Sequence, residues 1–198
     1  MNDFPQLAVR TASSKRALQW AFAWAFLFTA MHGYWYLGGR FGLGEGPNAL
    51  PGTPASLVAW IWTILVLLMF ALGLAVPIAL LKETRRRTLR RVLVTLLWGG
   101  SLILLARGAA GLLDDAIRDF GLSSGGITGF SYQQILGTSH PSPYTLISSA
   151  LIDGYFFLGG LLYGWAAWRC RVPPFSERFH TYGTEQHHRR SKPTRQRQ

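Results

Sequence analysis

The sequence predicts an all-α membrane protein in which four transmembrane helices form an antiparallel bundle and both termini lie in the cytoplasm. Three observations predict this fold class: the apolar residues stand in long blocks, each block matches the thickness of a bilayer, and basic residues gather on one side of the blocks. Hydrophobic residues make up 49% of the 198 residues and charged residues only 15%, whereas soluble domains contain roughly 25% charged residues. We therefore expect lipid to solvate much of the chain.

Each apolar block contains the roughly 20 residues that a helix needs to cross a 30 Å hydrocarbon core. A backbone in lipid has to satisfy its own hydrogen bonds, and the alternating pattern of a membrane β-barrel is absent, so each block is expected to be a helix. A cleaved signal peptide is the competing explanation of the first block, but that block exceeds a signal-peptide core and lacks a small-x-small cleavage site. The expected helices cover about residues 17–39, 57–81, 91–113 and 145–168.

The distribution of basic residues predicts the topology and a place in the cell membrane. Seventeen of the 20 Lys and Arg residues precede the first helix, join the second to the third, or follow the fourth. Because cytoplasmic segments of membrane proteins are enriched in Lys and Arg, residues 1–16 are expected to be a cytoplasmic lead-in to the 17–168 transmembrane domain. Residues 169–198 are expected to be a basic, disordered cytoplasmic tail. Topology thus explains the net charge of +11, and no nucleic-acid partner is expected.

Two loops are expected on the outer side of the membrane. The first is dense in glycine and proline, so we expect it to be irregular and folded back on the helix ends. In the second, the third helix should continue through Asp119, residues 123–129 should be a flexible Ser/Gly stretch, and residues 130–136 should lie in the membrane interface. Asp114 and Asp115 are expected to be solvated.

Three ionisable residues, His32, Arg107 and Asp153, lie within the expected spans. A charged side chain at the bilayer centre costs about 2.5 to 3.5 kcal/mol on insertion scales, so each should face the bundle and find a partner. At 1.5 Å per residue, all three lie roughly 7 to 11 Å below the outer surface of the hydrocarbon. Arg107 and Asp153 have opposite charges on neighbouring helices, and we predict that they pair. His32 is expected to join them as a hydrogen-bond partner or to titrate beside Asp153.

Two interpretations of these residues stay open. In the first, the ion pair only sets the helix register, and His32 satisfies a backbone carbonyl. In the second, His32, Trp35, Arg107 and Asp153 line a polar ligand-binding site that opens to the outer face.

Small residues on the fourth helix predict close helix packing. Gly160 and Gly164 form a G-x-x-x-G pair, which in membranes lets two backbones approach. We expect membrane lipids as partners, together with homo-oligomerisation through Gly160 and Gly164 as one use of the pair.

The sequence contains little that indicates catalysis. One intramembrane histidine is too few to hold a haem through two axial histidines, and a single cysteine, Cys170, leaves no internal disulfide and no C-x-x-C pair. No metal-ligand cluster and no G-x-S-x-G nucleophile motif is present. We therefore expect no metal and no cofactor, assign no catalytic residue, and consider an enzyme the less favoured class.

Two stretches are similar in sequence: HGYWYLGG at residues 32–39 and DGYFFLGG at residues 153–160. Together with GGSLILLARG at residues 99–108 and a proline-bearing outer loop, they resemble the domain of unknown function 3995 family of small membrane proteins. The resemblance implies a four-helix integral membrane protein. It implies no activity and no catalytic residues.

Three functions are compatible with these features. The first is a binding or accessory protein that holds a small amphipathic ligand, such as a lipid or a quinone-like molecule, in a polar pocket near the outer face. The second is an oligomeric proton-coupled small transporter, with Asp153 or His32 as the protonatable group. The third is a membrane enzyme that uses His32 and Asp153 as an acid–base pair.

Overall fold

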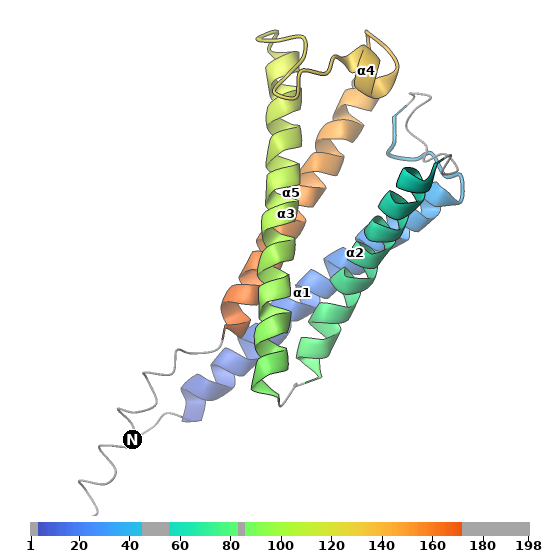
Figure 1. The fold of residues 1–198 in the computed structure, drawn as a ribbon. Helices are drawn as coiled ribbons and strands as arrows, with labels where there is room; N and C mark the ends of the chain where they lie inside the picture. Colours follow the sequence, from blue (N-terminus) through green and yellow to red (C-terminus); the bar gives the residue numbers. More distant parts are fainter. Residues whose placement is uncertain (1–3, 45–55, 83–85, 172–198) are drawn as a thin grey trace, which may run out of the picture.

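The structure is a computed structural model that describes residues 4–44, 56–82 and 86–171. These residues form five α-helices and no strand (Figure 1). The helices are α1 (Phe4–Tyr36), α2 (Leu57–Leu81), α3 (Arg87–Asp119), the short α4 (Tyr132–Leu136) and α5 (Pro143–Cys170). The all-helical fold class is thereby confirmed for this part of the chain. The expected tail lies outside the described residues from residue 172 onward.

Three helices, α2, α3 and α5, are long and apolar enough to cross a membrane. α1 has 33 residues but is not among them, because Gln19, His32 and its tryptophans and tyrosines lower its hydropathy. It also begins earlier than expected, so that the lead-in from Phe4 onward continues the same helix. The described residues therefore include three helices of membrane-spanning character and a fourth long helix that packs with them.

Local sequence explains where the membrane-length helices start. Ser56 caps α2 by accepting a hydrogen bond from the backbone N–H of Ala59, and Ser142 caps α5 in the same way through Thr145. Pro143 follows as the first residue of α5, a position at which the missing N–H of proline has no helical partner to lose.

Glycines bring α3 and α5 together. A Cβ atom on Gly108 would lie 2.5 Å from the backbone nitrogen of Phe157 and 2.8 Å from its Cα. Ser101 of α3 donates to the carbonyl oxygen of Gly160 at 2.7 Å. Gly160 and Gly164 both face α3 of the same chain, against Leu105 and Ser101. The expected close packing is confirmed within one chain, and homo-oligomerisation through this pair stays a prediction.

The core lies in the half of the molecule that is remote from α4. Its buried apolar residues come from the middle of α1, the end of α2, the first part of α3 and the end of α5; they include Ala17, Ala21, Val76, Leu97 and Ala166. In Figure 1 the α1/α2 pair and the α3/α5 pair approach each other in this half and separate toward α4.

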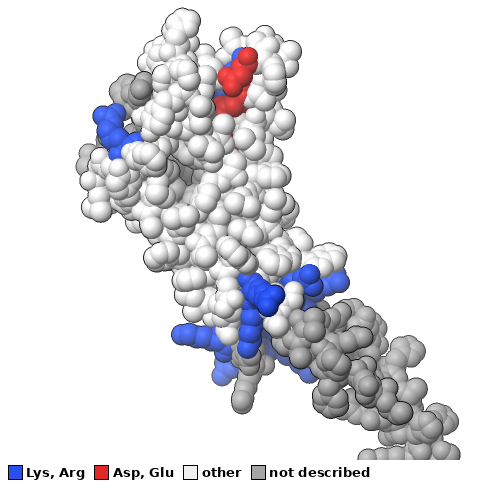
Figure 2. Space-filling view, turned by 180° about the vertical axis from the view of Figure 1, so that it is seen from behind, with Lys and Arg blue, Asp and Glu red and all other residues white. Residues whose placement is uncertain are grey.

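Charge is divided between the two ends of the molecule. Two hydrogen bonds bring the first part of α1 and the start of α3 to the end of α5: Ser14 donates to the carbonyl of Arg169 at 2.9 Å, and Arg90 donates to that of Cys170 at 3.4 Å. The basic side chains gather there, at the lower end of Figure 2, whereas carboxylates lie near the opposite end. The exposed basic residues of this end are Lys15, Arg16, Lys82, Arg86, Arg87, Arg90, Arg91, Arg169 and Arg171.

Candidate functional site

The predicted ion pair between Arg107 and Asp153 is present. Nη1 of Arg107 on α3 lies 2.6 Å from Oδ1 of Asp153 on α5. The Asp153 side chain is 6% exposed and that of Arg107 is 53% exposed. Gly111, one turn further along α3, makes room for the pair, because a Cβ there would overlap the Asp153 carboxylate and lie 2.6 Å from Nη1 of Arg107. The pair therefore combines a buried carboxylate with a half-exposed guanidinium.

The buried carboxylate is incompletely satisfied. Oδ1 of Asp153 accepts no hydrogen bond from the described residues, although Nη1 of Arg107 is close to it. The contact is thus a charge contact in which no N–H is well directed at Oδ1.

The exposed part of Arg107 lies beside an aromatic ring. Its Cζ is 5.2 Å from the ring centroid of Phe156 on α5. A guanidinium has five N–H donors in a planar fork, and Asp153 engages only one edge of it. The remaining donors are available to an acceptor group that approaches from outside the helix pair.

His32 stands apart from this ion pair. Its Nδ1 donates to the carbonyl oxygen of Phe28 at 2.8 Å, and its ring contacts those of Phe28, Trp35 and Phe70 at centroid distances of 4.1, 4.9 and 4.9 Å. The expectation that His32 would join Arg107 and Asp153 as a partner is therefore wrong in this structure. The other interpretation, in which His32 satisfies a backbone carbonyl, is confirmed. The acceptor lies one turn earlier on α1 itself, so His32 needs no hydrogen-bond partner from another helix.

Two phenylalanines lie between His32 and Arg107. Phe28 of α1 contacts Phe156 of α5 at 5.1 Å between ring centroids, with His32 packed on Phe28 and Arg107 on Phe156. Trp35, the fourth predicted site residue, donates from its indole N–H to the carbonyl of Phe41 at 2.9 Å. The four predicted site residues thus lie around one group of aromatic rings. Among them, only Arg107 and Asp153 form an ion pair.

The described part of the loop after α1, residues 37–44, folds back on α5 as expected. The backbone N–H of Gly42 donates to the Tyr144 hydroxyl at 3.0 Å. Gly44 is buried against Thr145 with a positive φ of 79°, and a Cβ there would lie 3.2 Å from Thr145 Cα. This loop therefore joins the α1 end of the molecule to the start of α5.

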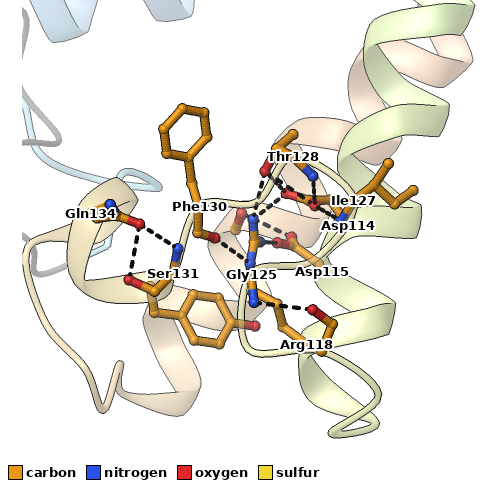
Figure 3. A network of polar contacts seen from close by, with 12 residues as sticks. Asp114, Asp115, Arg118, Gly125, Ile127, Thr128, Phe130, Ser131 and Gln134 are labelled. Carbon is orange, nitrogen blue, oxygen red and sulfur yellow. Dashed lines mark hydrogen bonds and ion pairs between the residues drawn. The ribbon is translucent and has the colours of Figure 1, made fainter.

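The sequence does not predict a second polar cluster, which lies at the C-terminal end of α3. Arg118 forms ion pairs with Asp114 and Asp115, and its side chain is 3% exposed. Its Nε donates to the carbonyl oxygen of Phe130 at 3.1 Å (Figure 3). The Asp114 and Asp115 side chains are 8% and 14% exposed, so the expectation that they are solvated is wrong.

Asp114 also organises the loop that was expected to be flexible. Its Oδ1 accepts the backbone N–H groups of Ile127 at 2.5 Å and Thr128 at 3.0 Å, and the Thr128 hydroxyl donates to Oδ2 at 3.1 Å. Gly126 permits this approach with a φ of 60°, and a Cβ there would overlap the carboxylate. The 123–129 stretch is therefore wrapped around a buried carboxylate. The feature of the sequence that could have indicated this cluster is the i, i+4 spacing of Asp114 and Arg118, which allows an ion pair on one face of a helix.

Two further contacts tie this cluster to its surroundings. Ser149 of α5 donates to Oδ2 of Asp115 at 3.0 Å. The Tyr132 hydroxyl of α4 donates to Oδ1 of Asp119 at 2.6 Å, and the Tyr132 ring lies 5.2 Å from Arg118 Cζ. Burial raises the pKa of Tyr132 well above its ordinary value, and the hydrogen bond to Asp119 raises it further. Tyr132 therefore stays a donor.

No group of three or more His, Cys, Asp or Glu side chains that could hold a metal ion occurs among the described residues. No protein-family model, no curated protein and no solved structure matches the chain. The resemblance to the domain of unknown function 3995 family therefore stays a prediction.

Proposed function

We propose that the chain is a multi-pass protein of the cell membrane, in which α1, α2, α3 and α5 all cross the bilayer and both termini lie in the cytoplasm. The gathering of basic side chains at one end supports this orientation. α1 is included because aromatic contacts and hydrogen bonds tie it to α5. In this arrangement Arg107 and Asp153 lie in the outer half of the membrane.

We further propose that the protein binds a small amphipathic ligand through Arg107. The supporting observation is the asymmetry of the ion pair: Asp153 is buried and Arg107 exposes half of its side chain. A guanidinium kept at this depth is expensive unless something accepts its remaining hydrogen bonds. Phosphate, carboxylate and carbonyl oxygens are such acceptors, and Phe156 offers an apolar surface beside them for a hydrocarbon tail.

Native mass spectrometry of the protein released from mild detergent tests this proposal. The wild-type chain should retain a co-purified lipid or other amphipathic molecule. Arg107→Gln should lose it, and Arg40→Gln, which removes an exposed arginine of the first outer loop, should retain it. Because Arg107→Gln leaves Asp153 without its counter-charge, the double variant Arg107→Gln with Asp153→Asn is tested as well. Equal retention in the wild type and the double variant would overturn the proposal.

A proton-coupled transporter is the second candidate, and one observation favours it. Asp153 is a buried carboxylate on a helix of membrane-spanning character, the kind of group that takes up and releases protons in transporters. A path of alternating access through four helices requires self-association. Asp153→Asn should then abolish proton flux into liposomes while leaving expression and folding intact. Flux that is equal in the wild type and in Asp153→Asn would exclude this role.

The third function, an enzyme with His32 and Asp153 as an acid–base pair, has no geometric support. His32 donates to its own helix, and Asp153 pairs with Arg107 on another side of the two phenylalanines.

A further inference from the structure

The segment between α3 and α5 presents apolar side chains outward. Five of them are exposed, by 80%, 76%, 59%, 54% and 42%: Phe120, Leu122, Ile127, Phe130 and Ile135. We call these five residues the outer-loop surface. No Lys, Arg, Asp or Glu occurs from residue 120 to residue 139. An exposed loop in water ordinarily carries charge, so this composition is unusual for a solvated segment.

The loop is held in place from its inner side. Asp114 accepts the backbone N–H groups of Ile127 and Thr128, and Arg118 donates to the carbonyl of Phe130. In Figure 3 the Phe130 ring points away from Arg118, although the Phe130 carbonyl faces it. Polar backbone groups of the loop are therefore satisfied by the buried ion pair, while apolar side chains remain outside. Backbone that enters an apolar medium needs this internal satisfaction.

The depth of the loop agrees with the membrane boundary. The expected third span ends at residue 113, and Asp114, the next residue, binds Ile127 and Thr128. The chain thus turns after α3 and returns to the level of Asp114, where the third span is expected to end. Leu113 of α3 and Ile147 of α5 are also exposed, by 55% and 59%, so apolar surface continues from the spans to the loop.

We propose that the outer-loop surface inserts into the boundary between headgroups and acyl chains of the outer leaflet, with the Asp114–Arg118 ion pair as its anchor. The occupant is lipid because the surface is uncharged and continuous with helices of membrane-spanning character. Its neighbour Tyr132 keeps a protonated hydroxyl, a group that suits the interface between water and lipid. This surface is separate from Arg107 and does not depend on the proposed ligand.

Quenching of a fluorophore on the loop tests the proposal in the full chain. Cys170 is the one native cysteine, so Cys170→Ser gives a background for Phe130→Cys or Ile127→Cys labelled with an environment-sensitive dye. The matched control is Gln133→Cys, an exposed polar position of α4. The proteins are reconstituted in phosphatidylcholine vesicles that contain a lipid with a spin label near the headgroup.

We expect dye at position 130 or 127 to be quenched several-fold more by the spin-labelled lipid than dye at 133, and several-fold less by iodide. Thr128→Val, which removes one donor to Asp114 and keeps the backbone N–H, should reduce the lipid quenching at 130. Arg118→Gln should reduce it further. Iodide quenching at 130 equal to that at 133 would overturn the proposal. Protection from both quenchers would also overturn it, since it would mean that protein covers the surface.

Discussion

Trp24 and Tyr155 exchange hydrogen bonds with each other's backbone. The indole N–H of Trp24 donates to the carbonyl of Tyr155 at 3.0 Å, and the Tyr155 hydroxyl donates to the carbonyl of Trp24 at 3.0 Å. Their rings stack at a centroid distance of 5.2 Å. This reciprocal pair joins α1 to α5 and lies one residue from Phe156, on which Arg107 packs. It is therefore both a structural link and a support for the candidate site.

Loss of one of these hydrogen bonds should be measurable. Tyr155→Phe keeps the ring stack and removes the donor to Trp24, and we expect a loss of about 0.5 to 1.5 kcal/mol in the free energy of unfolding. Thermal unfolding in detergent measures it. Tyr36→Phe, at an exposed position at the end of α1, is the control and should leave the midpoint unchanged. Equal effects of the two substitutions would contradict the role of the pair.

The two halves of the ion pair should respond unequally to substitution. Arg107→Gln leaves a buried carboxylate without its counter-charge, and breaking a buried pair in this way costs about 3 to 5 kcal/mol. Asp153→Asn leaves a half-exposed guanidinium that keeps the acceptor group of the proposed ligand as a partner, so its cost should be smaller. The double variant should recover much of the loss. Chemical unfolding in detergent is measured for the wild type, the two single variants and the double variant. If the losses in the free energy of unfolding simply add, the pair contributes no interaction energy.

Gly108 and Gly99 form a matched comparison on α3. A Cβ on Gly108 would meet the backbone of Phe157 at 2.5 Å, whereas one on Gly99 would meet no atom within 4 Å. Overpacking costs about 1 to 3 kcal/mol, so Gly108→Ala should lower the free energy of unfolding by that amount. Gly99→Ala should be neutral or stabilising, because alanine favours the helix over glycine by about 1 kcal/mol. Similar midpoints for both variants would indicate that α3 and α5 are less closely packed.

Tyr132 should ionise at a higher pH than an ordinary tyrosine. Its pKa is raised by burial and by its hydrogen bond to Asp119. The contribution of this hydroxyl to stability is therefore fully present below about pH 10, the ordinary value for tyrosine, and is lost only as the pH rises through the higher pKa of the folded state. The difference in tyrosinate absorbance between the wild type and Tyr132→Phe measures this ionisation. Tyr132 ionising at the ordinary value would mean that its hydroxyl is not buried against Asp119.

Some of the site was accessible from the sequence because it depends on position along a helix. Arg107 and Asp153 were placed at matching depth by counting residues, and the pair exists. His32 was placed at the same depth, yet it donates to Phe28. Depth is a distance along the helix axis, whereas contact also depends on the rotation of α1 and its separation from α5. Counting residues along a helix gives neither the rotation of α1 nor its separation from α5.

The sequence by itself determined where the apolar helices lie. α2 covers the expected residues 57–81, α5 differs from expectation by two residues at each end, and α3 extends to Asp119 as expected. Helix bounds follow from local hydropathy, caps and glycines, which act over a few residues. The tertiary structure was needed to show that Asp114 and Arg118 are buried beneath the loop between α3 and α5, and that Gly160 and Gly164 pack against α3. Those outcomes depend on which segments distant along the chain meet, and such meetings are set by the packing of whole helices.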